Sequence, residues 1–245
     1  MPLKQSEAIV LRSWPLREAD LLVSFFTRCE GKLRGVARSA KKSRKRFGGA
    51  LEPLTTVRLY WEDREGQELG RIDACEVLTS PLSERVDYPR AVALAHVAEV
   101  LDELLPDREV NDAVFRLALL VLGALSPGAI WAPLTYFDLW MVRLTGFLPE
   151  LEGCSICGVA FENEAAYFHP LCDGLMCAAD KRLASTVLSA DGCLLAEKML
   201  RAPLAHFTGQ EWPKARGADL RRFLVQRMER HTEKKLVTAA MLEKL

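Results

Sequence analysis

The spacing of apolar residues changes once along this chain, at about residue 80. Before that point, short runs rich in β-branched and aromatic residues alternate with turn residues, a pattern typical of β-strands. The expected strands cover residues 8–11, 21–27, 32–37, 55–61 and 69–79. Five short strands with one long loop predict a small closed barrel of the OB type, although an SH3-like barrel would fit the same pattern. We therefore expect residues 1–79 to form an OB-fold nucleic-acid-binding domain.

Beyond residue 80, apolar residues recur every three or four positions, which predicts helices. Asn111 stands where a helix N-cap belongs, directly before one such run. The expected helices cover residues 94–105, 111–123, 133–146, 185–200 and 218–233. The fold class expected is α+β, with a helical domain over residues 80–245 that carries an inserted zinc-finger-like module at 150–182.

Positive charge is concentrated between the third and fourth expected strands. Residues 28–46 hold nine Lys or Arg residues and a single acid, Glu30, although the whole chain has 33 bases and 33 acids. Such a run is more often a solvated loop than a binding site, but its density and its place between barrel strands favour contact with a polyanion. The residues expected to bind nucleic acid are Arg34, Arg38, Lys41, Lys42, Arg44, Lys45 and Arg46.

Charge is uneven elsewhere as well. Residues 80–200 carry 8 bases and 17 acids, whereas residues 201–235 carry 9 bases and 4 acids. The second basic segment is explained equally well by salt bridges to the acidic middle and by a further DNA contact.

Four of the seven cysteines lie between residues 154 and 177, a density that favours metal binding over disulfides. Cys154 and Cys157 form a C-x2-C knuckle, and Cys177 is the third expected ligand of a structural zinc ion. Cys172 would complete an all-thiolate site. Asp180 and His169 are alternative fourth ligands, and a module without metal also stays open.

Sequence signatures of enzymes are missing from the chain. It contains no phosphate-binding P-loop, no G-x-S-x-G elbow, no H-E-x-x-H and no deaminase signature. We therefore expect no catalytic residues and no enzyme, with a zinc-dependent enzyme as an alternative. The start of the chain does not resemble a signal peptide and no segment has the length of a membrane span, so we expect a cytoplasmic protein.

Three segments resemble the RecO family of bacterial DNA repair and recombination proteins. They are EAIVLRSWPLREADLLVSFFTRCEGKLRGVARSAKKSRKRFGGALEP at 7–53, LTGFLPELEGCSICG at 144–158 and DGLMC at 173–177. One departure is that Cys177 is followed by Ala178, Ala179 and Asp180, whereas family members with the metal commonly end in a second C-x2-C.

The resemblance implies an N-terminal OB domain, a helical domain and a zinc module. It also implies a nucleoid-associated factor of the RecF pathway that responds to DNA damage. Such a factor binds single- and double-stranded DNA, anneals complementary strands and acts with RecR to help RecA replace single-strand binding protein. The barrel alone would also suit an RNA-binding OB-fold protein of the translation apparatus.

Overall fold

The computed structural model describes residues 3–43, 45–63 and 69–245. The chain divides into two compact units, one formed by residues 1–127 with 240–245 and the other by residues 128–239. The unit that contains the barrel also contains the first two helices. The expected domain limits, 1–79, 80–245 and 150–182, stay predictions.

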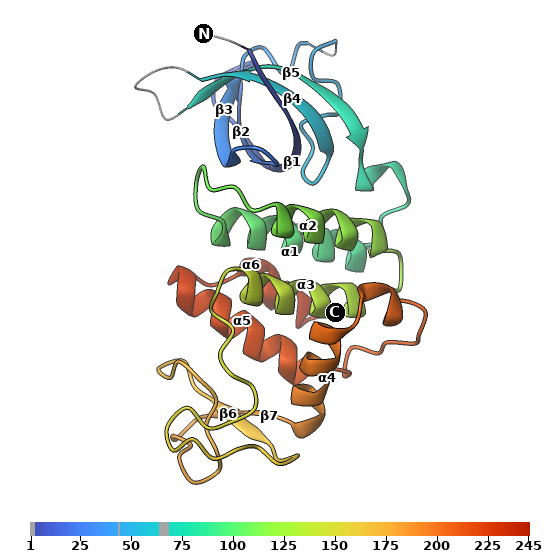
Figure 1. The fold of residues 1–245 in the computed structure, drawn as a ribbon. Helices are drawn as coiled ribbons and strands as arrows, with labels where there is room; N and C mark the ends of the chain where they lie inside the picture. The colour runs from blue at the N-terminus through green and yellow to red at the C-terminus, as the bar shows by residue number, and fades with distance from the viewer. Residues whose placement is uncertain (1–2, 44, 64–68) are drawn as a thin grey trace. The chain divides into compact units, whose positions relative to one another are not determined.

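The first unit begins with a closed five-stranded barrel (Figure 1). Its strands run in the order β1-β2-β3-β5-β4, and β1 pairs with β4 to close the sheet. The strands are β1 (Lys4–Pro15), β2 (Leu21–Thr27), β3 (Gly31–Ala37), β4 (Thr56–Glu62) and β5 (Gly70–Thr79). Among the strand pairs that the structure describes in the barrel, β3 with β5 is the parallel one. The predicted barrel and the α+β class are confirmed, and the first strand is longer than expected at both ends.

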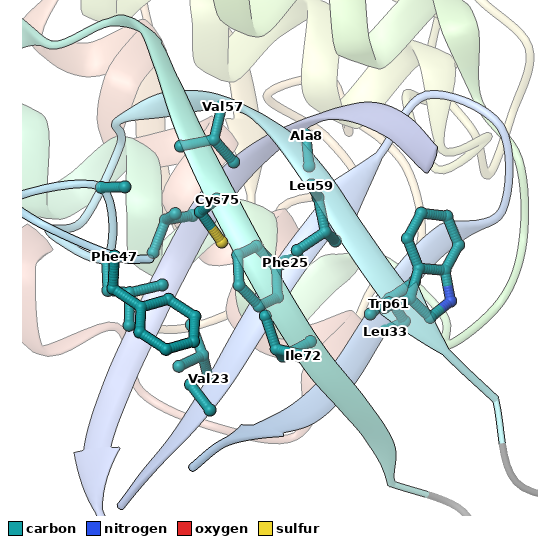
Figure 2. Packing of buried hydrophobic residues seen from close by; sticks show 14 residues of the cluster. Ala8, Val23, Phe25, Leu33, Phe47, Val57, Leu59, Trp61, Ile72 and Cys75 are labelled. Atoms are coloured by element: carbon teal, nitrogen blue, oxygen red, sulfur yellow. The ribbon is translucent and has the colours of Figure 1, made fainter. Parts of the chain in front are cut away.

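The barrel core is filled by inward-facing side chains of all five strands and by residues from the connection between β3 and β4 (Figure 2). Figure 2 shows the rings of Phe47 and Trp61 on opposite sides of this cluster. Gly35 leaves room for the Ile72 side chain, because a Cβ atom there would lie 2.3 Å from Cδ1 of Ile72. A larger residue at this position would force that side chain to move.

Residues 23–27 of β2 are buried on both faces, and Ser24 and Thr27 are the polar residues among them. Helices α1 (Tyr88–Leu104) and α2 (Asp112–Ala124) belong to the same unit, and the rings of Phe26 and Phe115 meet at 5.5 Å. The Ser24 hydroxyl donates a 2.8 Å hydrogen bond to Asp102 of α1. The Asn111 side chain accepts from the Val114 amide, so the predicted N-cap of α2 is confirmed.

Helix α1 begins six residues before the expected start, because the Asp87 side chain caps it by accepting from the Arg90 amide.

The second unit contains three long helices and a two-stranded sheet. Its elements are α3 (Trp131–Leu144), β6 (Ala166–Phe168), β7 (Thr186–Leu188), α4 (Ala190–Arg201) and α5 (Ala218–Thr232). Short elements elsewhere are the 3-10 turns Pro81–Ser83 and Leu204–His206 and helix α6 (Val237–Leu242). Across the described part of the chain, none of the helices has the length and apolar character needed to span a membrane.

Candidate nucleic-acid interface and metal centre

The loop between β3 and β4, residues 38–55, is fixed to the barrel at several points, and we call it the β3–β4 loop. At its start, the Ser39 amide donates to Oδ1 of Asp20 over 2.8 Å, and the Lys41 amide donates to the Ala19 carbonyl over 3.2 Å. Further along, the Arg46 carbonyl accepts from the Cys75 amide of β5. Anchoring at both ends limits the conformations of the loop, so less entropy is lost when it binds a ligand.

Phe47 provides the strongest of these anchors. Its side chain is 2% exposed and lies within the barrel core. The backbone on either side of it is turned, with the Phe47 amide donating to the Ser43 carbonyl and the Phe47 carbonyl accepting from the Ala50 amide. The ring is therefore part of the core and is not exposed for stacking on a base. By fixing this point of the loop, it keeps the preceding charged residues at the barrel surface.

Five cations on β3 and the β3–β4 loop are exposed, and among the residues that the structure describes their side chains have no hydrogen-bond or ion-pair partner. We call them the unpaired cations; they are Arg34, Arg38, Lys41, Lys42 and Lys45. All five were expected to bind nucleic acid. The expected residue Arg44 lies outside the described residues.

Two other bases of the segment, Lys32 and Arg28, already have partners elsewhere in the protein. Nζ of Lys32, which is 6% exposed, donates to the Asp102 carbonyl over 2.7 Å and lies 3.3 Å from Asp107. Arg28 pairs with Asp112 at 2.7 Å and with Glu7 at 3.1 Å. These contacts involve residues far away in the sequence, so the local charge pattern could not reveal them.

Arg46, which was also expected to bind nucleic acid, is half-buried. Its guanidinium lies 4.9 Å from the centre of the Phe47 ring, and its Nη2 donates to the Arg38 carbonyl over 2.6 Å. In this arrangement Arg46 holds the loop in shape, and its contact with nucleic acid stays a prediction.

In the second unit, three cysteines and one aspartate form a compact group. The ligand atoms of Cys154, Cys157, Cys177 and Asp180 all lie within 4.8 Å of one another. The knuckle that presents the first two is a tight turn in which the Gly158 amide donates to the Cys154 carbonyl over 2.9 Å. Gly158 has φ +76°, a backbone conformation that favours glycine.

The distances suit a tetrahedral metal ion. Thiolates about 2.3 Å from a zinc ion at tetrahedral angles lie about 3.8 Å apart, and the Cys157 and Cys177 sulfurs are 3.8 Å apart. Oδ2 of Asp180 lies 3.2 Å from the Cys154 sulfur and 3.3 Å from the Cys177 sulfur. The group can therefore bind a metal such as zinc through three sulfurs and one oxygen.

The structure places the alternative ligand Asp180 in this group, whereas Cys172 and His169 are not part of it. Asp180 follows Cys177 at the offset that the last cysteine of a second C-x2-C would have. Nδ1 of His169 instead accepts a hydrogen bond from the Leu171 amide at 3.1 Å. The spacing in the sequence allowed either Cys172 or Asp180 as the fourth ligand. The path of the backbone brings Asp180, and not Cys172, to the other three ligands.

Electrostatics at the group favour a cation. The pKa of the Cys157 thiol is raised to about 12, mainly by its contact with the Asp180 carboxylate. Contacts with Cys157, Cys154 and Cys177 in turn lower the pKa of Asp180. Four acidic groups so close together resist becoming negative at the same time, and a divalent cation between them would relieve that repulsion.

Comparison with known proteins agrees with this architecture. The family model for the N-terminal part of recombination protein O matches residues 1–81, and the model for its C-terminal part matches residues 85–239. The DNA repair protein RecO of Koribacter versatilis is 69% identical over 243 residues, 99% of each chain.

More distant relatives show the same relationship. The DNA repair protein RecO of Anaeromyxobacter sp. strain K is 30% identical over 240 residues, covering 97% of this chain and 94% of that protein. The DNA repair protein RecO of Geobacter sulfurreducens is 36% identical over 161 residues, 65% of each chain. The chain therefore belongs to the RecO family of DNA repair proteins, which are non-enzymatic recombination mediators.

Proposed function

We propose that this protein binds single- and double-stranded DNA through the β3–β4 loop and anneals complementary strands. The observation that carries the proposal is the set of five unpaired cations on β3 and the anchored β3–β4 loop. Lysine and arginine side chains without internal partners are available for phosphates, and binding them releases the counterions condensed on the DNA. The family to which the chain belongs supports DNA as the polyanion.

Contacts to phosphates alone would suit an annealing factor. They position the protein on the sugar-phosphate backbone and read no base sequence, so both complementary strands are bound equally well. Neutralising phosphates also weakens the repulsion between the two strands. The base pairs that form then supply the free energy, and no catalytic group is required.

We also propose the partners and the setting that family membership suggests. These are RecR, single-strand binding protein and, indirectly, RecA, with which the protein would act in the RecF pathway at the nucleoid in the cytoplasm. In this role the protein helps RecA replace single-strand binding protein on DNA.

Zinc would be held by Cys154, Cys157, Cys177 and Asp180, with Asp180 rather than Cys172 as the fourth ligand. A bound zinc ion would serve as a structural cross-link between the knuckle and residues 177–180. All four expected positions around the metal are then taken by protein atoms, as in closed structural sites.

A fluorescence assay of annealing tests the proposal. Two complementary oligonucleotides labelled with a donor and an acceptor dye are mixed with and without the protein, and the rate of energy transfer is followed. The wild-type protein should accelerate annealing, and replacing Lys41, Lys42 and Lys45 by glutamate should abolish the acceleration. An RNA pair of the same sequence tests the translation-related alternative, which gains support if RNA is bound and DNA is not. Absence of acceleration by the wild-type protein would contradict the proposal.

A further inference from the structure

A second feature of the barrel surface lies beside the β3–β4 loop. It is a hollow of about 170 Å³ between the β1–β2 connection, strand β3 and the start of β5. Apolar side chains line part of it, namely Leu16, Val36 and Leu69. Leu16 is 45% exposed and Leu69 is 36% exposed, so this apolar surface is open to solvent. The hollow is smaller than the 300–1,000 Å³ of ordinary ligand pockets, and it suits a single ring system rather than a larger ligand.

Three arginines complete the lining: Arg17, Arg38 and Arg71. Within the described part of the chain, the side chains of Arg17 and Arg38 have no partner. Arg71 forms two long ion pairs, with Glu62 at 3.9 Å and with Asp73 at 4.0 Å, both beyond hydrogen-bond distance. Among the described residues, no side-chain hydrogen bond therefore occupies any of the three guanidinium groups.

Arginines outnumber acids in the hollow among the described residues. Asp20 is the single carboxylate among the described lining residues, and its Oδ1 accepts the Ser39 amide. The hollow thus combines three exposed or partly exposed apolar side chains with three arginines, which is complementary to a ligand that joins an apolar ring to negative charge. A nucleotide has this composition.

We propose that this hollow holds one unpaired nucleotide of single-stranded DNA; the inference rests on the proposed function of the β3–β4 loop. The base would lie against Leu16, Val36 and Leu69, with the guanidinium planes of Arg17 and Arg71 stacked on it, and a flanking phosphate would meet Arg38. Arg38 belongs both to the hollow and to the unpaired cations, so a strand can pass from one to the other without a break.

The proposal separates the roles of the two surfaces. Bases in a duplex are paired and stacked, and bringing one into the hollow would require it to be flipped out at a cost of a few kcal/mol. The loop reads phosphates and should bind single strands and duplexes. The hollow needs a free base, and it should strengthen the binding of single strands alone.

The test compares the wild-type protein with an Arg17→Ala/Arg71→Ala variant. Three probes of equal length are used: a single-stranded oligonucleotide, a duplex, and a single strand with abasic sites in place of its bases. The variant should bind the single strand about tenfold or more weakly, since losing one stacked base costs on the order of 1–3 kcal/mol. Its affinities for the duplex and the abasic strand should fall no further than those of a matched Arg85→Ala/Arg143→Ala control.

A second variant, Arg17→Lys/Arg71→Lys, keeps the charge but loses the planar groups that stack. It should retain duplex binding and lose part of the preference for single strands. Equal losses on all three probes, or no loss on any, would overturn the hollow as a base site. If the wild-type protein bound none of the probes, the proposed function itself would fail, so the two failures can be told apart.

Discussion

Replacing three of the unpaired cations should change how DNA binding responds to salt. The variant is Lys41→Ala/Lys42→Ala/Lys45→Ala, and its three side chains are exposed without partners among the described residues. Surface substitutions of this kind change the free energy of unfolding by about 0.5 kcal/mol or less. The variant should therefore melt like the wild-type protein, and any change in binding reports on the interface.

The magnitude follows from counting phosphate contacts. If each of the five unpaired cations neutralises one phosphate, log K for duplex DNA should fall with log salt at a slope of about −4.5, and the variant should show about −1.8. Between 50 and 200 mM salt, the wild-type protein should then lose about 500-fold in affinity and the variant about 12-fold. The loss should be the same for duplexes of unrelated sequence.

Fluorescence anisotropy over a series of salt concentrations measures these slopes. The control is an Arg85→Ala/Arg143→Ala/Lys198→Ala variant, which removes the same charge from exposed positions outside the loop. Its slope should stay close to that of the wild-type protein. If the lysine variant kept the wild-type slope, or if the control flattened it equally, the reasoning from loop contacts would be refuted.

Three further predictions concern stability. Cys154→Ser should release zinc and lower the melting temperature, whereas Cys172→Ser should retain zinc. Metal analysis and thermal melting of both variants check this. Loss of zinc from the Cys172 variant would contradict Asp180 as the fourth ligand. Phe47→Ala should cost about 3–5 kcal/mol in urea unfolding, because it leaves a cavity in the barrel core; a cost below about 1 kcal/mol would argue against this packing. Burial alone would raise the pKa of Asp219, but hydrogen bonds from the side chain and amide of Ser189 hold it below its ordinary value. The ionised carboxylate therefore stabilises the fold at pH values above the ordinary pKa of an aspartate, and this contribution is lost as the pH falls through the lowered pKa. Asp219→Asn should flatten the acid side of a plot of unfolding free energy against pH. An unchanged acid side would contradict this role of Asp219.

Local patterns were sufficient to predict the barrel and most helices. Strand and turn residues alternate at short range, and Asn111 marks the start of α2 by its position alone. The short strands β6 and β7 were missed because three residues are too few to show a period.

The candidate interface was predicted only in outline. Charge density located the segment, but it could not show that Lys32 is bonded within the protein while Lys42 is exposed. That difference depends on α1, whose Asp102 carbonyl accepts a hydrogen bond from the Lys32 ammonium. Arg17 and Arg71 were missed for the same reason, since each is isolated in the sequence and the fold brings them to one hollow. Spacing likewise left Cys172 and Asp180 equally acceptable as ligands until the backbone path was known.

A salt titration of the wild-type protein on single-stranded DNA tests the central claim most directly. The five unpaired cations alone should give a slope of about −3.5. Oligonucleotides of unrelated sequence should give parallel lines. Binding that is insensitive to salt, or that follows base sequence rather than phosphate number, would contradict the claim that the loop holds DNA by its backbone.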